Sequence, residues 1–191
     1  PTHVPFLDQP VSVTFLRVVV MPEVGGDTVG ANTVNAYESL SPELRELADT
    51  LRIVHTNVHP DTRIDGGRAE SHPEWAESAK QFASTIYRAE HPAVRVHPET
   101  GEKVLFVNPN FTSHIVELSR REGTHLLAML YEHLSDASFT CRFPWEPGSL
   151  AFWDNRPTCH PVPTATPPGP PPPTPRPPVA GALPVRPSAP H

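Results

Sequence analysis

The distribution of proline is the feature that most constrains how this chain can fold. Of its 27 prolines, 14 lie between Pro161 and His191, and they are densest from Pro167 to Pro178. Proline lacks a backbone N–H, so it is excluded from helix interiors and central strands. We therefore expect polyproline II or disorder from Pro167 to Pro178, and a globular region confined to residues 1–160.

Composition argues against several classes of protein. The chain of 191 residues has a formal net charge of −6 and no run of Lys or Arg, so no nucleic-acid partner is expected. Its two cysteines, Cys141 and Cys159, cannot make a disulfide framework and are typical of a reducing compartment. We find no apolar stretch of transmembrane length and no signal peptide, which predicts no membrane partner and a cytoplasmic location.

Three segments are predicted to be helical. The first, from Glu43 to Leu51, follows the pair Ser41-Pro42, which is typical of an N-cap and a first helical residue. Its apolar face would carry Leu44, Leu47 and Leu51. A second helix is predicted from Pro73 to Tyr87. The third runs from Leu118 to Leu134, with an apolar stripe of Leu126, Leu127, Leu130 and Leu134.

Runs of β-branched and aromatic residues predict the strands. The segment Val11–Met21 alternates in its first half and is continuously apolar in its second, which indicates a strand that becomes buried before Gly25-Gly26-Asp27 breaks it. Further strands are predicted at Val94–Val96, Lys103–Val107, Phe139–Phe143 and Leu150–Trp153, with the first two joined as a hairpin. This order lacks βαβ alternation and favours a mostly β fold with helical insertions, a jelly-roll-like barrel.

A histidine beyond the last predicted strand is the strongest functional candidate. His160 follows the strand Leu150–Trp153, and a side chain held there is rigid enough to be a metal ligand, although an isolated histidine is more often structural. His55 and His59 lie four residues apart but lack the glutamate of a zincin motif, so they are not interpreted as ligands.

Several motifs, taken in order, resemble one family. Trp153-Asp154-Asn155-Arg156-Pro157-Thr158-Cys159-His160 resembles the signature that carries the last iron ligand of the taurine dioxygenase (TauD/TfdA) family. Gly25-Gly26-Asp27-Thr28 resembles a turn of that family, and the segments at His55, His91 and Phe111 follow in the family's order. The resemblance runs from about Val4 to His160. It implies a double-stranded β-helix, with Fe(II) as the metal and 2-oxoglutarate as the cosubstrate.

The resemblance also implies a division of the chain. Residues 1–160 would form the dioxygenase domain without the family's N-terminal third, so the jelly roll would be incomplete. Residues 161–191 would be a proline-rich tail in place of the segment that normally closes the domain.

Two iron-site positions follow from the resemblance. His160 is expected to be the distal iron ligand. The family's His-x-Asp pair of ligands falls at Pro1-Thr2-His3, where only His3 offers a ligating side chain. With two of three ligands altered, iron affinity is expected to fall severely.

Two positions are expected to bind 2-oxoglutarate. The family's turn threonine donates a hydrogen bond to a 2-oxoglutarate carboxylate, a role that falls to Thr28; from the residues alone, a turn-closing role toward Ala31 is equally open. Two arginines four residues apart follow the distal histidine in the family, the earlier binding 2-oxoglutarate and the later the substrate anion. Arg176 resembles the later one and Pro172 stands at the earlier position, which leaves Arg176 as the candidate.

Three functional hypotheses remain open. The first is a dioxygenase that uses molecular oxygen to oxidise a small anionic organic substrate, a sulfonate or alkyl sulfate, with release of succinate and CO2. The second is a decayed, non-catalytic homologue with at most a binding role, and we expect no substrate-dependent succinate release from this chain alone. The third treats Pro170–Arg176 as a ligand for aromatic-lined grooves. The family resemblance also favours a homo-oligomer.

Overall fold

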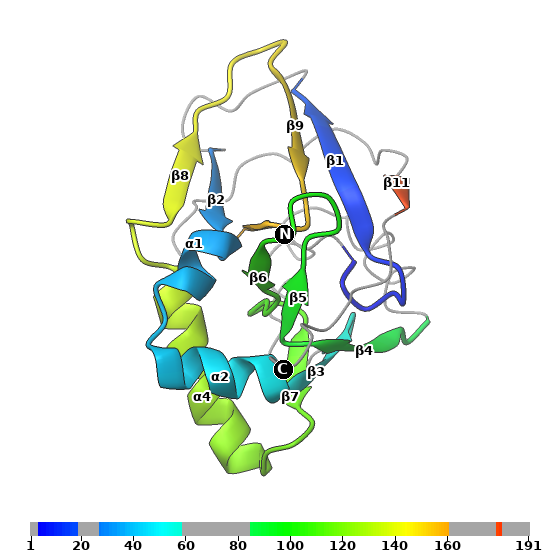
Figure 1. The fold of residues 1–191 in the computed structure, drawn as a ribbon. Coiled ribbons are helices and arrows are strands. Elements are labelled where there is room, and N and C mark those ends of the chain that lie inside the picture. The colour runs from blue at the N-terminus through cyan, green and yellow to red at the C-terminus, as the bar shows by residue number, and fades with distance from the viewer. Residues whose placement is uncertain (1–3, 19–26, 59–84, 161–178, 181–191) are drawn as a thin grey trace.

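The chain folds mainly into antiparallel β-sheet. The computed structural model describes residues 4–18, 27–58, 85–160 and 179–180. In these ranges the strands form three three-stranded sheets and one hairpin, and all the pairs are antiparallel. The helices of this part of the chain gather on one side of the molecule (Figure 1). The expectation of a mostly β fold with helical insertions is confirmed.

The first sheet has the order β11-β1-β9. Strand β1 (Val11–Arg17) pairs with β9 (Leu150–Asp154) on one edge and with β11 (Val179–Ala180) on the other. β1 ends at Arg17, and Val18 bonds to the turn before β9 through Gly148 and Ser149. Residues 19–21 of the predicted strand lie outside the described residues.

The second sheet has the order β10-β2-β8 and carries the candidate site. Its central strand β2 (Thr28–Asn32) pairs with β8 (Thr140–Phe143) and with the short β10 (Thr158–Cys159). The predicted strands at 139–143 and 150–153 therefore exist, in two different sheets (Figure 1).

The third sheet was not predicted. It has the order β4-β3-β7, from β3 (Arg52–Thr56), β4 (Arg88–Pro92) and β7 (Thr112–Ile115). The predicted hairpin is present as β5 (Val94–Val96) and β6 (Lys103–Leu105), two residues shorter than expected at its end.

The helices begin at capping residues that the sequence contains. The helix α1 (Thr33–Glu38) starts after Asn32, whose side chain accepts from two backbone N–H groups. α2 (Pro42–Thr50) starts after Ser41 with proline in its first turn, as predicted. α4 (Arg120–Leu134) starts at a capping box in which Ser119 and Glu122 bond reciprocally.

The core lies between these helices, β3, β7 and the β5–β6 hairpin. Its buried members include Tyr37, Leu40, Leu51, Ile53, Val94, Leu105, Val107, Ile115, Leu127, Leu130 and Leu134. The apolar stripe predicted for α4 is thus confirmed. On α2 the prediction was wrong for Leu47, which is 39% exposed, because Ala48 is the residue that turns inward.

The C-terminal end of the predicted helix from Pro73 to Tyr87 is not helical in the structure. Residues 73–84 lie outside the described residues, and residues 85–87 are not helical. The side chain of Asn57 holds this segment instead, donating to the Thr85 carbonyl and accepting from the Tyr87 N–H, each at 2.8 Å. These bonds occupy backbone groups that a helix would use.

One face of the first sheet is apolar and open. Phe15 and Phe152 lie opposite each other on β1 and β9 and stack at 5.8 Å between ring centroids. Phe152 is 71% exposed and Leu150 on the same strand is 66% exposed. None of the described helices has the length and apolar character needed to span a membrane.

Candidate functional site

His160 is held with one ring nitrogen bonded and the other free to bind a ligand. It directly follows β10, and its Nδ1 lies 3.2 Å from the Val29 carbonyl oxygen. Because a carbonyl only accepts, Nδ1 carries the proton and Nε2 carries the lone pair. Nε2 is buried and has no hydrogen-bond partner among the described residues. This is the state in which an imidazole ligates a metal.

The surroundings of His160 keep its ring in place. The indole of Trp153 meets the imidazole edge to face, with ring centroids 4.9 Å apart and planes at 75°. On the neighbouring strand β2, a Cβ built on Gly30 would lie 3.4 Å from Nδ1, so the backbone of β2 passes close to the ring. The indole nitrogen of Trp153 is also buried without a described partner.

The neighbouring Cys159 has no part in this site. It is buried, and its Sγ lies 3.9 Å from the Val107 carbonyl and from the Asn108 amide, in the interior. Burial raises the pKa of the Cys159 thiol, so it stays protonated and is a poor metal ligand.

Thr28 opens β2 and is oriented by a tryptophan. The indole Nε1–H of Trp145 donates to Thr28 Oγ1 at 2.9 Å. Beside it, Asp27 pairs with Arg142 of β8 at 2.7 Å. The alternative role considered for Thr28, closing a turn toward Ala31, does not fit the structure, because Thr28–Asn32 form the strand β2.

The turn between β9 and β10 is fixed by an ion network. Asp154 accepts from Arg156 Nε at 2.8 Å and lies 3.1 Å from His97 Nε2. Burial alone would raise the Asp154 pKa, but the bonds from Arg156 and His97 outweigh it and lower the pKa to about 2. Arg156 also pairs with Glu99 at 2.8 Å. The carboxylate is therefore charged at all ordinary pH values and anchors the turn that leads to His160.

A buried arginine also holds the turn between β9 and β10, by donating hydrogen bonds to its backbone. Arg95 Nη2 donates to the backbone carbonyls of Asn155 and Arg156 at 3.3 and 2.8 Å, and its guanidinium lies 3.9 Å from the centroid of Phe106. Burial lowers the pKa of Arg95 to about 9, so it remains charged near neutrality. Sequence reasoning missed Arg95 and Trp145, since both act from segments distant along the chain.

The other predicted site residues lie outside the described residues. These are His3 and Arg176, together with Pro1 and Pro172 at the altered family positions. Within the described ranges, no group of three or more His, Cys, Asp or Glu side chains is arranged to hold a metal ion. His160 and Thr28 are thus the two predicted site residues that the structure describes, both in the second sheet or at its edge.

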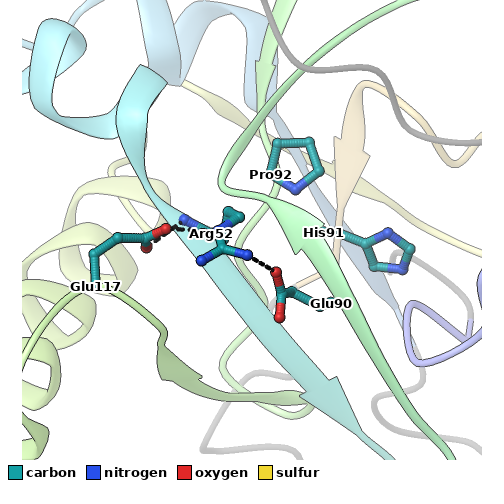
Figure 2. Close-up of a pocket in the computed structure, with 5 residues that line it drawn as sticks. All are labelled: Arg52, Glu90, His91, Pro92 and Glu117. Atoms are coloured by element: carbon teal, nitrogen blue, oxygen red, sulfur yellow. Dashed lines mark hydrogen bonds and ion pairs between the residues drawn. The ribbon is translucent and has the colours of Figure 1, made fainter.

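Two surface cavities of about 500 Å³ lie elsewhere and contain none of the predicted site residues. One is formed around Arg52, which Figure 2 shows between two carboxylates. Arg52 pairs with Glu90 on β4 and, at 2.7 Å, with Glu117. The one guanidinium is shared by two carboxylates, so the cluster keeps a net charge of −1. The second is a groove between β7 and α4.

The fold and site define an antiparallel β protein with a buried imidazole whose Nε2 has no partner among the described residues. The chain belongs to the Taurine catabolism dioxygenase TauD, TfdA family, whose model matches residues 2–170. It is 43% identical over 165 residues to an alpha-ketoglutarate-dependent sulfate ester dioxygenase of Pseudomonas putida, covering 83% of this chain and 52% of that protein. It is 39% identical over 160 residues to an alkylsulfatase of Acinetobacter baylyi, covering 83% and 49%.

Solved structures agree with this membership. A taurine dioxygenase from Burkholderia xenovorans matches with a TM-score of 0.67 and 42% identity over 82% of this chain and 47% of the other. AAD-2, solved in complex with Mn(II) and N-oxalylglycine, matches with a TM-score of 0.74 and 26% identity over 96% and 68%. The predicted jelly-roll fold is thereby confirmed. The chain spans about half the length of the curated relatives it matches.

Proposed function

We propose that this protein is an Fe(II)- and 2-oxoglutarate-dependent dioxygenase, and that His160 and Thr28 form part of its cofactor site. The observation that carries the proposal is the buried Nε2 of His160, which has no described partner while Nδ1 is fixed by the Val29 carbonyl. A neutral imidazole fixed in this tautomer suits a non-haem iron site. His3 is proposed as a further ligand.

The residues of this chain would divide the work of binding. His160 Nε2 would hold Fe(II), and the Thr28 hydroxyl would donate to a carboxylate of 2-oxoglutarate. Arg176 would neutralise an anionic group of the cosubstrate or substrate. When bound, Fe(II) supplies the oxygen activation by which 2-oxoglutarate and O2 yield succinate, CO2 and an oxidised substrate.

The proposed substrate is a small organic sulfate ester or sulfonate. Support comes from the relatives, which are named for sulfate esters, alkyl sulfates and sulfonates. We also propose a cytoplasmic location, which the free thiols of Cys141 and Cys159 support. Self-association remains a prediction from the family resemblance.

A decayed, non-catalytic homologue is the second candidate. It is favoured by the sequence at two positions, since proline stands where the family has its first iron ligand and its cosubstrate arginine. This candidate retains the fold but predicts no specific binding of metal or 2-oxoglutarate.

An anaerobic titration of the chain with Fe(II) and 2-oxoglutarate separates the two candidates. The proposal predicts a saturable visible charge-transfer band, together with quenching of the Trp153 fluorescence, whose ring contacts His160. His160→Ala should weaken metal binding at least about tenfold. His125→Ala, at an exposed position on α4, is the matched control and should bind like the wild type. A folded chain without the band would favour the decayed homologue.

A further inference from the structure

Trp145 is the described group that bonds to the Thr28 hydroxyl. It lies in the loop between β8 and β9, 117 positions along the chain from Thr28, and is 8% exposed. Its ring packs edge to face on Phe143, with centroids 4.7 Å apart. The indole N–H reaches Thr28 Oγ1 at 2.9 Å, a good hydrogen-bond length.

This contact restricts what the Thr28 hydroxyl can do. A hydroxyl has one proton to donate and two lone pairs to accept with, whereas an indole N–H only donates. Trp145 must therefore occupy a lone pair of Oγ1, and the proton of Thr28 points away from it. A hydroxyl that accepts one bond is also polarised toward donating the next. Thr28 is thus prepared to donate to an acceptor, of which a carboxylate is the strongest.

We propose that Trp145 is a positioning residue that orients Thr28 to bind the carboxylate of 2-oxoglutarate. This inference rests on the proposed function and adds to it a residue that does not itself touch the cosubstrate. Trp145 acts through its N–H, which is separable from its packing. Phenylalanine at this position would keep an aromatic ring against Phe143 and remove the N–H together with one ring of the buried indole, so the Thr28 backgrounds are needed to isolate the hydrogen bond.

A double-mutant cycle tests the proposal, using the affinity for 2-oxoglutarate measured by calorimetry in the presence of Mn(II). Trp145→Phe should weaken binding about three- to tenfold, the effect of one hydrogen bond. Thr28→Val should weaken it at least as much. In the Thr28→Val background, Trp145→Phe should have no further effect, because the hydroxyl that it orients is gone. In Thr28→Ser, which keeps the hydroxyl, the dependence on Trp145 should return.

A second readout separates positioning from general packing. The indole Nε1–H resonance of Trp145 should shift when 2-oxoglutarate is added, and should move to a position typical of an unbonded indole in Thr28→Val. Thermal melts of each variant establish that it is folded before its affinity is compared.

The outcomes are distinct. The positioning role is overturned if Trp145→Phe binds 2-oxoglutarate as tightly as the wild type. It is also overturned if Trp145→Phe weakens binding equally in the wild type and in Thr28→Val. Either result leaves the proposed function intact. Absence of 2-oxoglutarate binding by the folded wild-type chain overturns the proposed function, and the positioning role with it.

Discussion

At the scale of single residues, the interior contains titratable groups that the candidate site does not use. His55 is fully buried, with its ring 5.9 Å from that of His91. Burial, followed by the charges of His91 and Arg95, lowers the pKa of His55 well below its usual value. Burial also lowers the pKa of His91. Both rings are therefore neutral in the folded protein near pH 7.

The free energy of unfolding should fall as pH drops below about 6.5. A histidine that is neutral when folded takes up a proton on unfolding below its ordinary pKa, so each such group costs up to about 1.4 kcal/mol per pH unit. The loss begins at the unfolded pKa and ends at the lowered folded pKa. Urea denaturation from pH 7.5 to 5 measures this slope.

Two variants test whether His55 causes this pH dependence of the unfolding free energy. His55→Gln should reduce the pH dependence of the unfolding free energy by up to about 1.4 kcal/mol per pH unit, the contribution of one proton. His125→Gln, on the exposed face of α4, should leave this dependence unchanged. Equal slopes in the wild type and His55→Gln would contradict the assignment.

At the scale of elements, the turn between β9 and β10 determines where His160 lies. Its carboxylate, Asp154, is held by Arg156 and His97, and its carbonyls by Arg95. The turn thereby joins the site sheet to the β5–β6 hairpin, because Arg95 lies on β5 and His97 lies between β5 and β6.

Asp154→Asn should destabilise the protein by about 1 kcal/mol at pH 7, a value discounted because the Asp154 side chain is partly exposed. The folded pKa of about 2 lies below the unfolded value, so the wild type's advantage is complete above about pH 4 and is lost as pH falls toward 2. Urea titrations of both proteins at pH 7 and pH 3 should show the difference shrinking. Glu99→Gln, at a side chain that is 72% exposed, is the control and should cost under about 0.5 kcal/mol.

Elements with local signals were predictable from the sequence, and those without were not. The leucine stripe of α4 predicted its buried face and its end at Leu134, while the helix starts at Arg120 and not at the predicted Leu118, because Ser119 caps it. Strand β4 gave no such signal, because its inward positions are Ala89 and His91 and its outward ones are charged. The alternation is present in burial but not in hydrophobicity.

The same limit applies to the candidate site. His160 and Thr28 lie in recognisable motifs, so both could be named from the sequence. Trp145, Gly30 and Arg95 could not, because their roles depend on contacts made across sheets between residues that are far apart in sequence. Pairings of this kind are set by the tertiary fold and leave no periodic trace in the chain.

At the scale of the whole molecule, apolar residues are unevenly placed between the core and the open face of the first sheet. Leu134 is 2% exposed in the core cluster, while Phe152 is 71% exposed beside Phe15. Leu134→Ala should therefore cost about 2–5 kcal/mol of unfolding free energy. Phe152→Thr, which replaces an exposed aromatic residue by a β-branched one of high strand propensity, should cost under about 1 kcal/mol.

Chemical denaturation measures both costs, and dye binding measures the surface. Phe152→Thr should lower the fluorescence of a bound hydrophobic dye in the native protein, because it removes the most exposed ring of the face. A loss of stability in Phe152→Thr as large as that in Leu134→Ala would show that this face is packed in solution.

Gly30 lies against the imidazole of His160, so the size of the residue at position 30 bears on the candidate site. A Cβ at this position would contact the imidazole of His160, at 3.4 Å from Nδ1, and the Thr158 methyl group at 3.6 Å. A methyl group is therefore accommodated there, and any longer side chain would start in contact with the ring. Under the proposed function, evolution of the metal affinity would therefore also depend on position 30 of β2, which is not itself a ligand.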